Sequence, residues 1–181
     1  MELRWLGHAC FTVTHNGYTL AIDPYNADYI PGYPKLRGVK ADKLLISHDS
    51  YGHNYIPGIV LSGRPESDCP FTITPMEVWH DTVCGIMRGS CLIHLIEADG
   101  LRVAHMGDIG APLTGEQLSK LYDPAMVRHY DTDRITITAD MEPQIAVLKF
   151  LGPTEEEQGN IVKKSSVLSR AVSKLHISRR K

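Results

Sequence analysis

The pattern of apolar and polar positions in the first part of the chain predicts β-strands joined by tight turns. Alternating residues predict strands at 2–6, 10–14 and 18–22, and Asn16-Gly17 between the last two is a favoured hairpin dipeptide. A compact apolar strand predicted at 43–47 runs directly into a histidine. The N-terminal part therefore predicts a sheet with polar residues where its strands end.

The rest of the chain predicts a second group of strands and few helices. The strands are predicted at residues 71–74, 76–79, 91–98, 101–105, 125–130 and 145–150. Thr114 followed by Gln117 predicts a capped helix over 114–121. Apolar residues at helical spacing predict an amphipathic helix over 161–175. Many hairpins with few helices favour one layered α/β (α+β) domain over residues 1–181.

The composition is that of an ordinary globular protein and excludes some partners. The 181 residues are 43% hydrophobic and 22% charged, which suits one compact domain with its own core. The formal net charge of -2 gives no field that would favour nucleic acid or an anionic membrane. We therefore expect neither as a partner, and a homo-oligomer stays open.

Several features favour a cytoplasmic location. No apolar run approaches the ~18 residues of a membrane span, and the strand pattern begins at Glu2, so no signal peptide is expected. The four cysteines contain no C-x-x-C pair and are expected to be reduced. The basic residues at 178–181 predict a solvated tail.

Histidines and aspartates follow the predicted strands in four places. These are the stretches 48–53, 79–81, 105–110 and 128–131. Imidazole and carboxylate are the usual ligands of a catalytic divalent metal, and strand ends hold such ligands rigidly. A single histidine on a loop is more often structural, so the residues alone leave both a structural role and a divalent-metal site open, although four such clusters carry more weight than one.

Five segments make the sequence similar to a known superfamily. They are Trp5-Leu6-Gly7-His8-Ala9-Cys10-Phe11, Ala21-Ile22-Asp23-Pro24, the 48–53 stretch, His80-Asp81 with Arg88-Gly89, and residues 101–110. The chain resembles the metallo-β-lactamase superfamily, and within it the small Zn-dependent hydrolases that include ascorbate-phosphate lactonase. The resemblance implies a four-layer αββα sandwich with a metal site at one edge of its two sheets.

The main motif of that superfamily, H-x-H-x-D-H, is incomplete here. His48 matches its first histidine and His53 its last, but Ser50 stands at the second histidine and Gly52 at the aspartate. Serine is a poor zinc ligand and glycine supplies none. The resemblance therefore implies a metal site that has lost two ligands.

The resemblance implies that three further ligands remain, His80, Asp108 and His129. We expect one divalent ion, zinc in the first place, or none, held most tightly through His53, Asp108 and His129, which form the half-site with three side-chain ligands. The segment before His129 is too short for the strand and helix usual in relatives, so a reduced second half is expected.

Other polar residues are expected to support the site. His8 is expected near the mouth of the site, where it supports a ligand or contacts the substrate, or else is a structural histidine. Ser50 is expected to hydrogen-bond there, and His105 to give buried support to Asp108. His94 alternates with apolar neighbours and is expected to face solvent.

Two functions follow from this reading. The first is a metal-dependent hydrolase that acts on an ester, lactone or phosphoester with a single-metal site and Asp108 as its catalytic carboxylate. The alternative is a catalytically inactive descendant that binds a small ligand or partner in the cleft of the ancestral metal site. The presence of stoichiometric metal separates the two.

Overall fold

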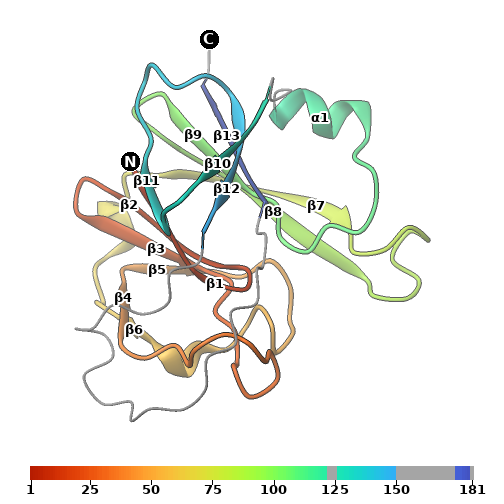
Figure 1. Cartoon of the computed structure of the whole chain (residues 1–181), viewed down its shortest axis with the longest axis horizontal. Helices are drawn as coiled ribbons and strands as arrows, with labels where there is room; N and C mark the ends of the chain where they lie inside the picture. The colour runs from red at the N-terminus through yellow and green to blue at the C-terminus, as the bar shows by residue number, and fades with distance from the viewer. Residues whose placement is uncertain (122–125, 150–173, 180–181) are drawn as a thin grey trace.

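A computed structural model describes residues 1–121, 126–149 and 174–179 of the chain. Its N-terminal sheet has the strand order β11-β1-β2-β3-β5 (Figure 1). The bounds are β1 Glu2–Gly7, β2 Cys10–His15, β3 Tyr18–Ile22, β5 Lys43–Leu45 and β11 Arg134–Thr136. All neighbours pair antiparallel except β3 and β5, which are parallel, so β5 ends at the same edge of the sheet as β3.

The second sheet has six strands in the order β10-β12-β13-β9-β8-β7. Their bounds are β7 Thr72–Trp79, β8 Ser90–Ala98, β9 Leu101–His105, β10 Met126–Tyr130, β12 Gln144–Leu148 and β13 Lys174–Arg179. The remaining elements are the parallel pair β4 Val39–Ala41 and β6 Ile59–Leu61, the 3-10 helices Ile56–Gly58 and Glu66–Asp68, and the helix α1 Gly115–Leu121.

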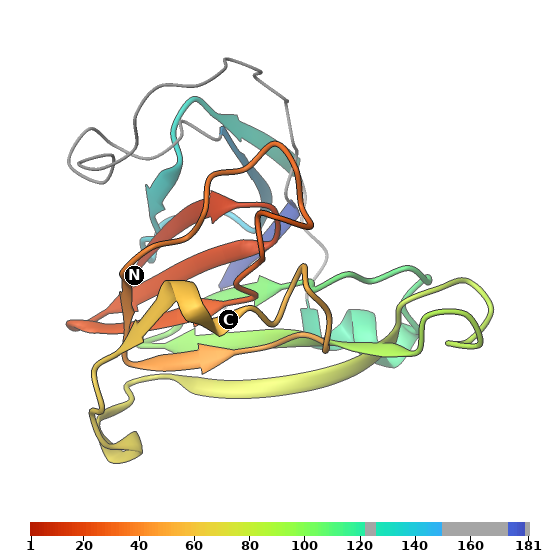
Figure 2. The same ribbon diagram turned by 90° about the horizontal axis from the view of Figure 1, so that it is seen from below.

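The two large sheets pack face to face around the main core (Figure 2). Buried side chains such as Leu20 and Ile22 of β3 belong to the same core cluster as Ile96 and Val103 of the second sheet. A second cluster lies on the other face of β8, where Leu121 of α1 packs with Val78, Cys91, Ile93 and Leu95. The predicted α/β fold is confirmed, and α1 supplies the helical cover of the second sheet within the described residues.

Local turn chemistry explains several of the predicted elements. Asn16 and Gly17 (φ 48° and 72°) and Asp99 and Gly100 (φ 49° and 76°) adopt the left-handed backbone that a two-residue hairpin requires. Thr114 and Gln117 form the predicted capping box through reciprocal bonds of 3.2 and 2.9 Å. The two strands predicted around Pro75 are one strand, β7, which lies at the sheet edge, where the missing N–H of proline is tolerated.

The C-terminal prediction was wrong where the structure describes it. Most of the predicted helix over 161–175 lies outside the described residues, but its last two residues, Lys174 and Leu175, begin β13. The expected tail also starts inside this strand, which includes Ser178 and Arg179. Pairing with β12 on one side and β9 on the other gives β13 a ladder that local propensity cannot predict.

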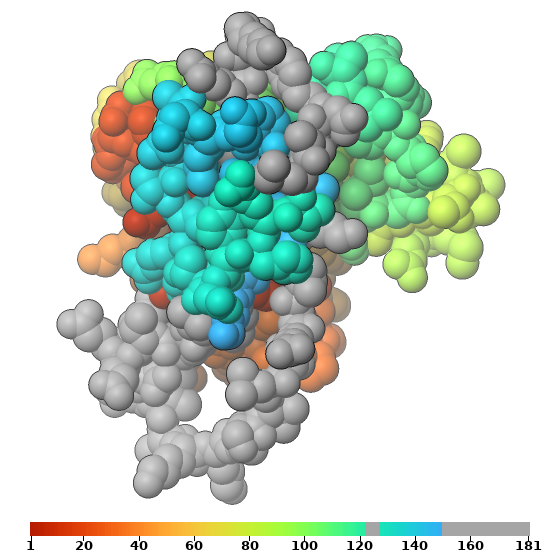
Figure 3. Space-filling model, turned by 45° about the horizontal axis from the view of Figure 1, so that its top comes forward, coloured from red at the N-terminus to blue at the C-terminus, as the bar shows by residue number. Residues whose placement is uncertain are grey.

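An apolar segment projects from the described part of the chain. The segment between β7 and β8 stands out from the body (Figure 3) and exposes Ile86 and Met87 at 84% and 77%. Across the three described ranges, no helix is long and apolar enough to cross a membrane.

Candidate metal centre

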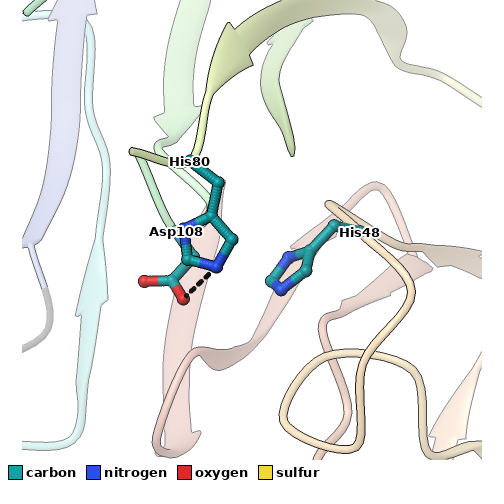
Figure 4. A group of neighbouring side chains, drawn as sticks. All are labelled: His48, His80 and Asp108. Carbon is teal, nitrogen blue, oxygen red and sulfur yellow. Dashed lines mark ion pairs between the residues drawn. The ribbon is translucent and has the colours of Figure 1, made fainter. Parts of the chain in front are cut away.

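Three side chains from three strand ends converge at one edge of the sandwich. His48 follows β5, His80 follows β7 and Asp108 follows β9. One potential ligand atom from each lies within 4.8 Å of the other two. His80 Nε2 is 3.2 Å from Asp108 Oδ2, and His48 approaches from the other side (Figure 4). The fold thus joins residues that are 60 positions apart in the sequence.

Close backbone contacts hold these loops together. A Cβ at Gly110 would lie 2.1 Å from the His80 carbonyl oxygen, and Gly110 N–H donates to Trp79 O at 3.0 Å. Gly107 has a left-handed backbone (φ 57°), and a Cβ there would lie 2.6 Å from Leu92 O and 3.0 Å from the Cβ of Ser47, the residue before His48. Glycine at both positions lets the loop carrying Asp108 approach the loops carrying the two histidines.

His53 lies beside this group and is oriented by a buried aspartate. Asp23 is fully buried and accepts the His53 Nδ1–H at 2.9 Å and the Ser47 N–H at 2.6 Å. An ionised carboxylate is only an acceptor, so the His53 proton lies on Nδ1 and its Nε2 lone pair faces outward. That Nε2 is 3.8 Å from Asp108 Oδ2.

Electrostatics keep Asp23 ionised and His48 neutral. Burial raises the pKa of Asp23, but the His53 hydrogen bond, the charges of His105 and His53 and the Ser47 hydrogen bond outweigh it, so the pKa lies below its ordinary value. Burial, and then the neighbouring His53 and His80, lower the pKa of His48. Neutral imidazole is the form that binds a metal.

His8 lines the same site from the N-terminal sheet. A bulge between Trp5 and Gly7 ends β1, and His8 follows with a left-handed φ of 47°. Its ring lies 5.2 Å from that of His53, centroid to centroid. Burial and then His53 lower the pKa of His8, against the opposing charges of Asp108 and Asp23.

The two departures from the motif lie between His48 and His53. Gly52 is buried, and a Cβ there would lie 3.0 Å from His8 Nε2. The Ser50 carbonyl accepts the His53 N–H at 3.0 Å, which makes the turn that returns the chain to the site. His8 therefore lies in front of the position that lacks a side chain.

The structure does not bring His129 to the group. His129 is exposed on β10, the strand at the far edge of the second sheet. β10 lies three strand positions from β9, which is roughly 14 Å at ~4.8 Å per strand. His53 and Asp108 therefore meet at the site without the third ligand that the resemblance implied.

Two other histidines lie beneath the site. His105 is buried, and its Nδ1 accepts the Gly107 N–H at 3.3 Å, next to Asp108. The expectation that His94 faces solvent was wrong. The residue is 5% exposed, and its Nε2 lies 3.0 Å from the Ile46 carbonyl oxygen. Strand β8 is covered on both faces, so alternation along it does not mark a solvent side.

Two aspartates matter more than the sequence indicated. Asp23 orients His53, as described. Asp81 accepts four backbone N–H groups, of Val83, Gly85, Met87 and Arg88, at 2.8–3.0 Å, and so shapes the loop after His80. Both aspartates follow predicted strands and lie in segments that resemble the superfamily. That position was the signal in the sequence by which they could have been found.

Comparison with known proteins assigns the family. Residues 2–153 match the family described as beta-lactamase superfamily domain, so the chain belongs to that family. The predicted membership of the metallo-β-lactamase superfamily is thereby confirmed.

The chain is similar to several individual members. It is 27% identical to a UPF0173 metal-dependent hydrolase of Thermococcus onnurineus, over 68% of each chain. It is 38% identical to a UPF0173 protein of Pyrococcus abyssi, over 29% of this chain and 23% of that one. Among solved structures, a Thermotoga maritima protein of the metallo-β-lactamase superfamily has 25% identity and a TM-score of 0.45, with 70% of this chain and 60% of that chain covered.

The ligand chemistry fits a divalent metal. Two donors about 2.0–2.2 Å from one ion are at most about 4.4 Å apart, and the His80–Asp108 separation of 3.2 Å lies within that limit. Two imidazoles and one carboxylate are a ligand set used by catalytic zinc sites. The residues present thus suit zinc or a similar ion.

Proposed function

We propose that the protein is a metal-dependent hydrolase with one ion held by His48, His80 and Asp108. The convergence of these three donors within 4.8 Å at the sheet edge carries the proposal. The name of the Thermococcus relative, a metal-dependent hydrolase, supports the same reaction type. Because the chain spans about two thirds of that relative, the reaction is proposed for the residues present.

We propose a small ester, lactone or phosphoester as the substrate. A bound divalent ion lowers the pKa of its water to about 7 and polarises the scissile oxygen. Asp108 is the carboxylate beside the reacting atoms, and its 53% exposed side chain leaves the site open to a small molecule. His48, held neutral by burial and its neighbours, keeps a lone pair for the ion.

Metal content and turnover test the proposal together. The metal-free protein would be titrated with zinc by calorimetry, beside His48→Asn, His80→Asn and Asp108→Asn. We expect one tight event in the wild type that weakens at least tenfold in each variant. His15→Asn is the control, because His15 pairs with the exposed Asp99 away from the site.

The zinc-loaded protein would then be tested on nitrophenyl acetate, a small lactone and bis-nitrophenyl phosphate. Turnover that the three ligand variants lose supports the hydrolase. Tight zinc binding without turnover of any of these favours the inactive descendant that binds a ligand. Absence of zinc binding contradicts the proposed site.

A further inference from the structure

Two imidazoles outside the group of three ligands lie next to this site. His53 is one of them. Its Nδ1 is committed to Asp23, so its Nε2 is the atom left for a cation. The separation of 3.8 Å between His53 Nε2 and Asp108 Oδ2 is below the limit of about 4.4 Å for two donors on one ion.

His8 is the other imidazole, and the backbone places its ring beside that of His53. The bulge between Trp5 and Gly7 turns the end of β1, and bulges commonly redirect side chains at functional sites. The Trp5 Nε1–H donates to the His8 carbonyl at 2.8 Å, which holds the left-handed conformation. A non-glycine residue at positive φ is uncommon and indicates a constraint imposed by its surroundings.

The missing side chain at Gly52 makes room for this ring. His8 Nε2 would be 3.0 Å from a Cβ at position 52, so even alanine there would press on the imidazole. The His8 ring lies edge-on to that of His53, with an interplanar angle of 68°. His8 therefore occupies the space through which any longer side chain at position 52 would pass.

We propose that His8, His53 and Asp108 hold a second, weaker divalent ion, with Asp108 shared between the two ions. This inference rests on the proposed function, because it uses the same carboxylate. His8 supplies a ligand where Gly52 supplies none. The second ion binds more weakly because only His48, His80 and Asp108, among the described residues, have ligand atoms all within 4.8 Å, so His8 must move toward Asp108.

Titration of the metal-free protein with Co²⁺, followed by calorimetry and visible absorption, tests this inference. We expect two events in the wild type. His8→Asn should weaken the second event at least tenfold and leave the first unchanged. Asparagine suits the left-handed backbone of residue 8, so the variant should fold. Gly52→Ala is a second probe, which should weaken the same event by displacing the ring.

The outcomes separate this inference from the proposed function. Loss of the first binding event in His48→Asn, together with loss of the second binding event in His8→Asn, supports both the proposed function and the second metal site. A single event that His8→Asn leaves unchanged overturns the second site and keeps the first. Two events that His8→Asn and Gly52→Ala leave unchanged also overturn the role of His8. The His15→Asn protein should match the wild type throughout.

Discussion

Replacing Asp23 by asparagine tests whether the buried carboxylate sets the direction of His53. Asparagine keeps the size and one acceptor oxygen, but its NH2 group is a donor. If that oxygen keeps the Ser47 N–H, the NH2 group faces His53 Nδ1, which must then accept. The neutral ring would carry its proton on Nε2, the atom that faces Asp108.

The loss of stability can be worked from these contacts. A hydrogen bond to a charged group contributes about 1.5–3 kcal/mol, so Asp23→Asn should lower the free energy of unfolding of the metal-free protein at pH 7 by about that amount. For a chain of this length, each kcal/mol lowers Tm by roughly 2–4 °C. Urea unfolding followed by circular dichroism, in the presence of a chelator, measures the change.

Asp99→Asn is the matched control. Asp99 also has a left-handed backbone (φ 49°, against 48° for Asp23) and also bonds a histidine, His15, at 2.8 Å. Its side chain is 72% exposed, so solvent screens the interaction and we expect little change. If the two variants lost equal free energy of unfolding, the reasoning would be refuted, since burial would then not strengthen the bond between aspartate and histidine.

The difference in the free energy of unfolding between the wild type and Asp23→Asn should also depend on pH. The pKa of Asp23 is below its ordinary value, so the ionised carboxylate contributes stability above the unfolded-state pKa of about 3.9. That contribution is lost as the pH falls through the lower pKa of the folded state. The difference should therefore be full at pH 7 and shrink below about pH 4; growth on acidification would contradict the assignment.

Further predictions concern the backbone around the site. Gly110→Ala should lower the free energy of unfolding by about 1–3 kcal/mol and weaken zinc binding, because its Cβ would meet the His80 carbonyl at 2.1 Å. Gly115→Ala, in α1 with nothing within 4 Å of its Cβ, is the control and should be neutral or stabilising by thermal unfolding. Asp81→Ala should speed hydrogen exchange of the amides at 83–88 and weaken zinc binding at His80, because four N–H groups lose their acceptor; unchanged exchange would show that the loop holds its shape without Asp81.

Elements with local signals could be predicted from the sequence. The hairpins at Asn16-Gly17 and Asp99-Gly100 require residues that accept positive φ. Asn-Gly and Asp-Gly are the dipeptides that favour this backbone, so the turns can be predicted from the sequence. Strand β13 has no such signal, because its residues gain strand structure only by pairing with β9 and β12. Apolar spacing in that region favoured a helix, and non-local pairing overrode it at Lys174 and Leu175.

The candidate ligands of the metal centre could be predicted from the sequence, but which of them lie close together could not. His48, His80 and Asp108 each follow a strand, and the superfamily motif drew attention to them. Which strand ends meet depends on strand order, so the sequence could not show that His129 lies at the far edge of the sheet. The closeness of His8 to Gly52 depends on the bulge after Trp5, which no local pattern in the sequence specifies.

Rebuilding the motif at Ser50 and Gly52 shows how His8 and the missing aspartate are related. Ser50→His with Gly52→Asp restores H-x-H-x-D-H, and the backbone at Gly52 is outside the left-handed region that would disfavour aspartate. The obstacle is His8, whose Nε2 would lie 3.0 Å from the new Cβ. Aspartate 52 and His8 would therefore compete for one space.

A third substitution relieves that competition. We expect the double variant to bind zinc only slightly more tightly than the wild type, and each single change to help less. Adding His8→Asn to the double variant should tighten binding by about tenfold, since a ligand set completed with room for its side chains gains affinity that a crowded one does not. Zinc titration by calorimetry, with circular dichroism to confirm folding, measures all variants. If the triple variant binds no more tightly than the double, the ring of His8 does not obstruct position 52, and the geometry of the other ligands limits the site.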